Sequence, residues 1–147
     1  FANPQNMQDA ISQFCRDSNQ PEPETVGQYV RCIFESLAFS YRKVLTFLKQ
    51  VAPFPIHRLH VIGGGAKNDF LNQLVADVIQ LPVVAGPSEA TAVGNGLVQA
   101  RAAGLVCDRW EMRRFILSSL SPQIFVPQKE FEMYKDAYQK FLSLTSK

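Results

Sequence analysis

The chain has 147 residues, an apolar content of 46% and a formal net charge of +2 at pH 7. This composition suits one globular domain, and the small charge with scattered Lys and Arg argues against a nucleic-acid partner or a membrane surface. Three cysteines show neither metal-ligand spacing nor a dense disulfide framework, so we expect a cytoplasmic protein with reduced thiols. Because the chain begins with Phe1 rather than Met, we expect it to be a piece of a longer protein.

Two helices are predicted before the first strand. Asn6 is a typical N-cap for a short helix over residues 7–16, and a loop with two prolines follows it. Thr25 and Gln28 have the spacing of a capping box at the start of a long helix over residues 26–50. Apolar residues recur along it at intervals of three and four, which predicts one broad face buried in the core. That face contains Val26, Val30, Ile33, Phe34, Leu37, Tyr41, Val44, Leu45 and Leu48.

A strand, a glycine turn and a helix follow one another over residues 59–78. Residues 59–62 are apolar or β-branched apart from His60, and Gly63, Gly64 and Gly65 come directly after them. The apolar period then changes to that of one helix face. Glycines let a ligand approach the backbone closely, and a helix start carries unpaired N–H groups and positive potential. Together these features favour a phosphate or another anion at the turn.

The glycine pattern taken alone leaves other interpretations open. Asn68 stands where the dinucleotide-binding fingerprint of the Rossmann fold has its third glycine, and no Gly-Lys-Ser/Thr follows as in a P-loop. A tight strand-to-helix turn that binds nothing would also fit the residues. The motif therefore identifies a candidate site, and the choice between these readings needs the rest of the chain.

A second short strand and another helix come next. Residues 83–85 read as a buried strand, which gives a parallel βαβ unit with a right-handed crossover. Ser88 is the predicted N-cap of a helix over residues 89–103. Gly94 and Gly96 each cost about 1 kcal/mol relative to Ala inside a helix. We therefore expect this helix, which has little side-chain bulk, to pack closely beside the glycine turn.

The remainder reads mainly as helix. Residues 109–120 and 130–144 are amphipathic, and residues 123–127 form a brief extended segment between them. Only two strands are thus predicted, and a two-stranded parallel sheet is not stable by itself. The sequence therefore predicts that further strands belong to a preceding part of the protein.

The run over residues 61–77 resembles the adenine-nucleotide loop of the FGGY carbohydrate kinases. In that family a turn of three glycines is followed by Asn, then Gln, then Ala-Asp. Asn68, Gln73, Ala76 and Asp77 stand at those places in this sequence. The combination is far more specific than the glycines alone.

Other stretches carry the same resemblance. Residues 82–84 and 89–94 are similar to the family's Pro-Val strand and its Glu-x-Thr-Ala-x-Gly helix start, and residues 31–39 resemble a helix with Glu-Ser-Leu-Ala. Within the family, residues 1–11, 31–39 and 84–90 most resemble the L-rhamnulokinase branch. The resemblance covers nearly the whole chain and is weakest after Gly104.

The resemblance implies an α/β fold class: a helix-rich fragment of an actin-like ATPase or ribonuclease H-like domain with a short parallel βαβ unit. Residues 1–147 would be the C-terminal portion of the second, nucleotide-side domain of a two-domain kinase, and the N-terminal kinase domain would be its partner. Such enzymes use ATP and Mg²⁺ to phosphorylate a sugar, here L-rhamnulose, giving L-rhamnulose 1-phosphate. Closure of the two domains positions the reacting groups.

The resemblance also implies which residues bind the nucleotide. Gly63, Gly64 and Gly65 would pass close to it, Ala66 would line the same turn, and Asn68 would bind the adenine or order the loop. It implies no metal ligand and no catalytic residue in this chain, because the family's general base is an Asp in another context. The aspartates that lack that context are Asp9, Asp17, Asp69, Asp77, Asp108 and Asp136.

Two further functions stay open from the sequence. The alternatives to the rhamnulose kinase are a non-catalytic, nucleotide-binding regulatory module of the same superfamily and part of a kinase for another ketose, because a fold does not fix a function. In each case the isolated chain is expected to be inactive. Its unpaired apolar surface is expected to make it self-associate.

Overall fold

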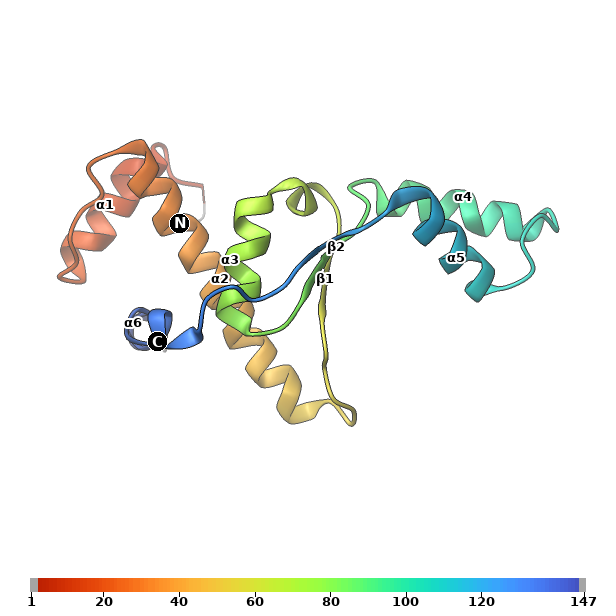
Figure 1. Cartoon of the computed structure of the whole chain (residues 1–147). Helices are drawn as coiled ribbons and strands as arrows, with labels where there is room; N and C mark the ends of the chain where they lie inside the picture. Colours follow the sequence, from red (N-terminus) through yellow and green to blue (C-terminus); the bar gives the residue numbers. More distant parts are fainter. Residues whose placement is uncertain (1–2, 146–147) are drawn as a thin grey trace.

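The computed structural model describes residues 3–145, so Phe1, which contributes to the resemblance, lies outside the described residues. Helices and strands alternate much as the sequence predicts (Figure 1). The α-helices and strands are α1 Met7–Asp17, α2 Val26–Val51, β1 Leu59–Val61, α3 Asp69–Ile79, β2 Val83–Ala85, α4 Ala90–Ala102, α5 Arg109–Leu120, β3 Gln123–Phe125 and α6 Lys135–Thr145. Two short 3₁₀ helices, η1 Gly64–Lys67 and η2 Phe131–Tyr134, precede α3 and α6.

The sheet has three strands in the order β1-β2-β3 within the described residues. β1 and β2 are parallel, with Leu59 opposite Val83, which confirms the predicted βαβ unit. β3 pairs antiparallel with β2, and Phe125 lies opposite Val83. The expectation of only two strands was therefore wrong, because the brief extended segment at residues 123–127 supplies a third. β2 lies in the middle of the sheet, and all three of its residues are buried.

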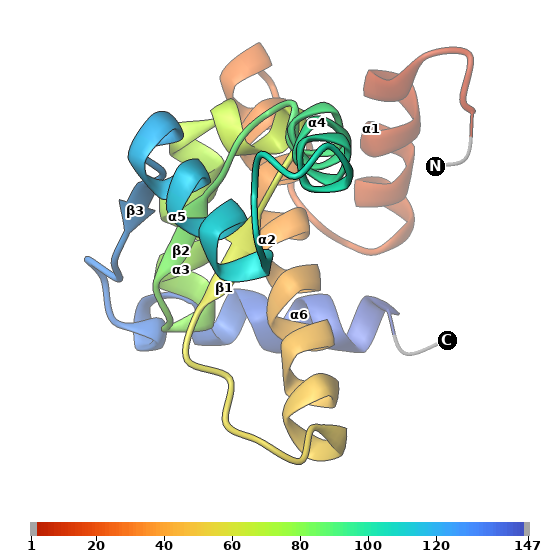
Figure 2. The same cartoon turned by 90° about the vertical axis from the view of Figure 1, so that its right-hand side faces the viewer.

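The core lies where α3 packs between the sheet and α2. Val75 and Val78 of α3 and Val83 of β2 are among the large side chains that are fully buried. α2 adds Ala38 and Phe39, and the C-terminal segment adds a cluster of aromatic rings around Tyr138. In Figure 2 α6 crosses beside α2, so the C-terminal helix closes this core.

α2 buries only a small part of the face predicted for it. Its capping box is present, with the Thr25 hydroxyl accepting from the Gln28 N–H and the Gln28 side chain accepting from the Thr25 N–H. However, the buried residues of α2 are Ala38, Phe39 and Leu45, and of these only Leu45 belongs to the predicted face. Most of the predicted face is exposed, at 38–69%: Val26, Val30, Ile33, Leu37, Tyr41, Val44 and Leu48. We call these seven residues the α2 stripe. Although α2 is long, no helix within residues 3–145 has the length and apolarity needed to cross a membrane.

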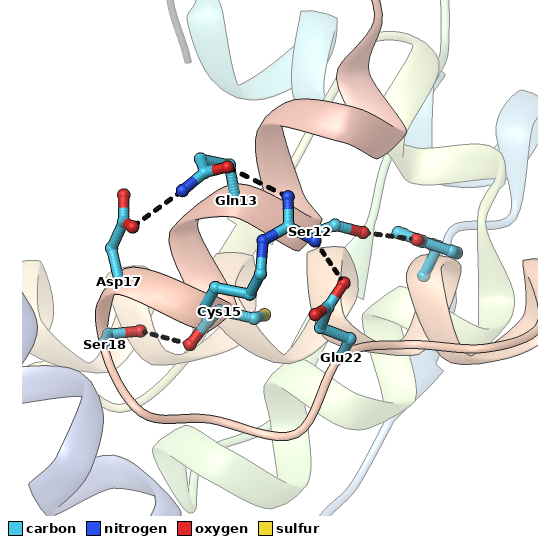
Figure 3. Close-up of polar contacts among 8 residues, drawn as sticks. Ser12, Gln13, Cys15, Asp17, Ser18 and Glu22 are labelled. Atoms are coloured by element: carbon cyan, nitrogen blue, oxygen red, sulfur yellow. Dashed lines mark hydrogen bonds and ion pairs between the residues drawn. The ribbon is translucent and has the colours of Figure 1, made fainter.

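One polar contact joins α1 directly to α2, and another joins α1 to the loop that connects the two helices (Figure 3). Asn6 caps α1 as predicted, its side chain accepting from the Gln8 N–H. The hydroxyls of Ser12 and Tyr29 lie 2.6 Å apart, and Arg16 pairs with Glu22 at 2.7 Å. The second contact is exposed, so on its own it contributes little to stability.

α1, α2 and α6 surround an apolar hollow of about 560 Å³. Cys15 and Cys32 both line it, and all three cysteines of the chain are free thiols. Burial raises the pKa of the Cys32 thiol, and the neighbouring Cys15 adds to this effect. None of the residues that line the hollow belongs to the glycine turn.

α4 and α5 form an arm that projects from the sheet, away from α2 and α3 (Figure 1). Ser88 does not cap α4, because the helix begins one residue later than predicted, with Glu89 at the N-cap and no side-chain cap bond. The expected close packing of α4 was also wrong. A Cβ atom on Gly94 or Gly96 would meet no heavy atom within 4 Å among the described residues.

Candidate functional site

The two parallel strands end side by side, and their following turns are joined by hydrogen bonds. The N–H of Gly63 donates to the carbonyl of Pro87 at 3.2 Å, and the N–H of Gly86 donates to the carbonyl of Val61 at 2.8 Å. Ligands of open α/β sheets bind in the crevice beyond the carboxyl ends of the strands. The candidate site therefore lies at this edge, where the structure places the glycine turn.

The three glycines of the turn differ in what the backbone requires. Gly63 has φ +80° and ψ −161°, a region that side-chain-bearing residues rarely adopt, so the turn needs glycine there. Gly64 does not have a positive φ, and a Cβ atom on it would meet no heavy atom within 4 Å in the described part of the chain. The fold of residues 3–145 thus gives no reason for glycine at position 64. Close approach of a ligand from outside would give one.

Ala66 and Asn68 hold the turn against α3. Ala66 is 7% exposed and belongs to the core, so its side chain faces inward and only its backbone can face a ligand. The Asn68 side-chain oxygen accepts from the N–H of Leu71 at 3.0 Å and caps α3. Gly64 and Gly65, which lie between Gly63 and Ala66, remain exposed.

The sequence did not predict the roles of two residues near the turn. A Cβ atom on Gly86 would lie 3.3 Å from the Ile62 side chain, so glycine lets the two turns approach each other. Its signal in the sequence is the Gly-Pro pair directly after a strand, which reads as a boundary until the strands are known to be parallel. The second is Asn72, whose side chain donates to the Ala66 carbonyl at 3.0 Å.

Asp77, at the other end of α3, fastens the C-terminal segment to this helix. It is 3% exposed, and its carboxylate accepts from the N–H of Gln128 at 2.7 Å and from the Gln73 amide at 2.9 Å. Burial raises the pKa of Tyr134, and the nearby Asp77 carboxylate raises it further. The Asp77 carboxylate is used by these structural hydrogen bonds, and they explain why the motif has an aspartate at this position.

The site offers backbone groups and a helix start for binding. Lys67 is exposed beside the turn, and Asp69 lies in the first turn of α3. Within residues 3–145, no group of three His, Cys, Asp or Glu side chains is placed to hold a metal ion. The exposed backbone of Gly64 and Gly65 is therefore the part of the site that a ligand can approach closely.

Comparison with known proteins identifies the family. Residues 1–103 match the C-terminal domain of the FGGY family of carbohydrate kinases. The chain belongs to this family. The match includes the glycine turn, α3, β2 and α4, so the FGGY resemblance read from residues 61–77 is confirmed.

Individual relatives agree with this result. The chain is 54% identical over 128 residues to a rhamnulokinase of Bacteroides thetaiotaomicron, covering 87% of the chain and 26% of the relative. It is 40% identical over 145 residues to a rhamnulokinase of Pectobacterium atrosepticum, covering 99% of the chain and 29% of the relative. The chain thus spans between a quarter and a third of the length of these relatives.

A solved structure supports the fold class. The crystal structure of xylulose kinase from Rhodospirillum rubrum matches 86% of this chain and 25% of its own, with a TM-score of 0.66 and 24% identity. The predicted fold class, a helix-rich α/β part of an actin-like ATPase domain with a parallel βαβ unit, is confirmed.

Proposed function

We propose that this chain is the nucleotide-side part of an ATP-dependent kinase that phosphorylates L-rhamnulose. Membership of the FGGY family supports sugar phosphorylation, and the rhamnulokinase relatives at 40–54% identity support this sugar. The structural observation that carries the nucleotide assignment is Gly64. It is an exposed glycine, without positive φ, at the carboxyl end of parallel strands.

In this function the turn holds the adenine nucleotide, and the catalytic residues lie in another part of the complete enzyme. The backbone of Gly63, Gly64 and Gly65 approaches the nucleotide, while buried Ala66 and the cap at Asn68 keep the turn in place. ATP supplies the phosphoryl group, and Mg²⁺ neutralises charge on its phosphates. Residues 1–147 would form the C-terminal portion of the second domain. The N-terminal kinase domain would supply the general base and most sugar contacts.

A cytoplasmic location follows from the same proposal. ATP as the substrate and free thiols at Cys15, Cys32 and Cys107 are both typical of a reducing, nucleotide-rich compartment.

The Gly64→Val variant of the complete kinase tests the nucleotide assignment. A branched side chain on Gly64 would fill the space in which the nucleotide approaches, so KM for ATP should rise by about tenfold or more, a loss of roughly 1.4 kcal/mol. KM for L-rhamnulose should change far less. Steady-state kinetics with each substrate varied in turn measures both constants.

Gly96→Val is the matched control, because its Cβ atom also meets no heavy atom within 4 Å among the described residues. It lies on α4 outside the turn and should leave both constants close to those of the parent enzyme. Equal rises in the two KM values for Gly64→Val would count against the assignment. Binding of ADP without any sugar phosphorylation by the complete protein would favour a regulatory module instead.

A further inference from the structure

Asn72 is a polar side chain placed inside an apolar core. It lies in the first half of α3, is 1% exposed, and is as deeply buried as Val75, Val78 and Val83. Asn is a poor residue for a helix interior, and a buried amide is costly unless it is hydrogen-bonded. An apolar residue of similar size would fill the same space without that cost. The presence of an amide here therefore calls for a specific hydrogen bond.

That hydrogen bond goes to the glycine turn. The Asn72 side-chain nitrogen donates to the Ala66 carbonyl at 3.0 Å, across six residues of sequence, while the Asn72 backbone N–H donates to the Asn68 carbonyl at 2.9 Å. The Ala66 N–H in turn donates to the Gly63 carbonyl at 3.0 Å. Asn72 thus fixes the inner end of η1 to the helix behind it, in a buried place where water does not compete for the bond.

The bond lies directly behind the exposed glycines. On the far side of the turn, the Gly63 N–H is held by the Pro87 carbonyl at 3.2 Å. Gly64 and Gly65 therefore lie between two hydrogen-bonded residues, Gly63, which is bonded to Pro87, and Ala66, which is bonded to Asn72. Two consecutive glycines would otherwise sample many backbone conformations. A rigid turn binds a ligand better than a flexible one because it loses less entropy on binding.

We propose that Asn72 is a positioning residue for nucleotide binding, acting through the Ala66 carbonyl rather than by touching the nucleotide. The inference rests on the proposed function of the turn. It adds a buried side chain of α3 to a site otherwise built from the turn itself. Loss of the Asn72 donor should loosen Gly64 and Gly65 and weaken nucleotide binding selectively.

The first test is Asn72→Leu in the complete kinase, which removes the donor and keeps a buried side chain of similar size. KM for ATP and Kd for ADP, the latter by calorimetry, should rise by about fivefold or more, as expected for one lost hydrogen bond. KM for the sugar should stay within about twofold. A purely structural role would lower the melting temperature and the active fraction while leaving KM for ATP and Kd for ADP unchanged. That result would overturn the proposal.

Asn95→Leu is the matched control, because Asn95 is exposed on α4, and it should leave all constants unchanged. Comparison with Gly64→Val distinguishes a role of Asn72 from the existence of the nucleotide site. If Gly64→Val raises KM for ATP and Asn72→Leu does not, the role of Asn72 is wrong and the site stands. If neither variant changes KM for ATP, the proposed nucleotide site itself is wrong.

Asn72→Asp keeps the test decisive if the leucine variant does not fold. The side chain has the same shape, but a carboxylate cannot donate to the Ala66 carbonyl, whereas the protonated acid can. Burial raises the pKa of such a carboxyl. KM for ATP should therefore recover toward the parent value as the pH falls from about 8 to about 6, relative to the parent enzyme at each pH. Parallel pH profiles for the two proteins would overturn the proposal.

Discussion

At the scale of single residues, glycines of one short run serve different purposes. Gly63 is required by its own backbone conformation, since its φ is +80°. Gly64 has no such requirement and no heavy atom within 4 Å of its potential Cβ position among the described residues. The sequence shows three identical letters at 63–65. Only the backbone angles and the space around each position separate the glycine that the turn needs from the one that a ligand would need.

The cysteines provide a prediction at the same scale. Burial raises the pKa of Cys32, so at a given pH it has less of the reactive thiolate than a thiol with the ordinary pKa. Cys107 is exposed and Cys15 is buried. Iodoacetamide should therefore label Cys107 first in the folded chain. Labelling of Cys32 should become appreciable only at higher pH.

Mass spectrometry of tryptic peptides over a pH series measures these rates. The unfolded chain in urea is the control, because there the three thiols should react at similar rates. Equal rates for Cys32 and Cys107 in the folded chain at neutral pH would contradict the described burial of Cys32.

At the scale of elements, α4 shows why small residues do not by themselves indicate close packing. Gly94 and Gly96 were expected to allow close packing against the glycine turn, which would have made Gly94→Leu destabilising. The arm formed by α4 and α5 instead stands away from the body (Figure 1). No overpacking is now expected at either glycine, because a Cβ atom at each lies in open space.

A small side chain at these two positions should therefore raise the stability of the helix rather than lower it. Gly94→Ala and Gly96→Ala should each stabilise α4 in the 147-residue chain by about 1 kcal/mol, because alanine loses less backbone entropy in a helix. Urea denaturation followed by circular dichroism measures the change in the free energy of unfolding. A loss of stability in either variant would show that α4 packs against another element after all.

At the scale of the whole molecule, the chain exposes two surfaces that are usually covered, an apolar helix face and a strand edge. The α2 stripe is 38–69% exposed, although its spacing is that of a buried helix face. β1 lies at an edge of the sheet, so its outer edge is available for another strand. We propose that both surfaces are covered in the complete kinase by the rest of the polypeptide, because the matched part makes up only 26% and 29% of the length of the two relatives.

Self-association of the isolated chain follows from this surface. Light scattering should show an average mass that rises with concentration above that of a monomer. Val30→Lys with Val44→Lys, both in the α2 stripe, should reduce the effect, because charges on an apolar face oppose its burial. The control is Gln50→Lys with Gln139→Lys at exposed polar positions. A strict monomer at high concentration would contradict the prediction.

The isolated chain should also be inactive. In the proposed enzyme the general base and the sugar contacts would lie mostly in the N-terminal kinase domain and at the start of the second domain, and the phosphates of ATP would need a closed cleft around them. A coupled assay with L-rhamnulose and Mg-ATP should give no turnover above background. The complete kinase is the positive control. Turnover by residues 1–147 alone would show that a catalytic residue lies within this chain.

The sequence by itself determined those features that depend on local physics. Helix caps at Asn6 and Thr25, the change of period after the glycines and the buried strand at residues 83–85 were all predicted and are all present. Side-chain capping bonds and apolar period involve neighbours within a few residues, so one segment contains the whole signal. The family resemblance rests on the same short segments.

The tertiary structure decided what depends on distant partners. β3 is a strand only because β2 offers an edge, and the α2 stripe is exposed only because the buried face of α2 is set by α3. The role of Asn72 appears once η1 folds back onto α3. These contacts join segments whose pairing no local pattern specifies. The sequence therefore located the glycine turn, while the fold showed which residues hold it in place.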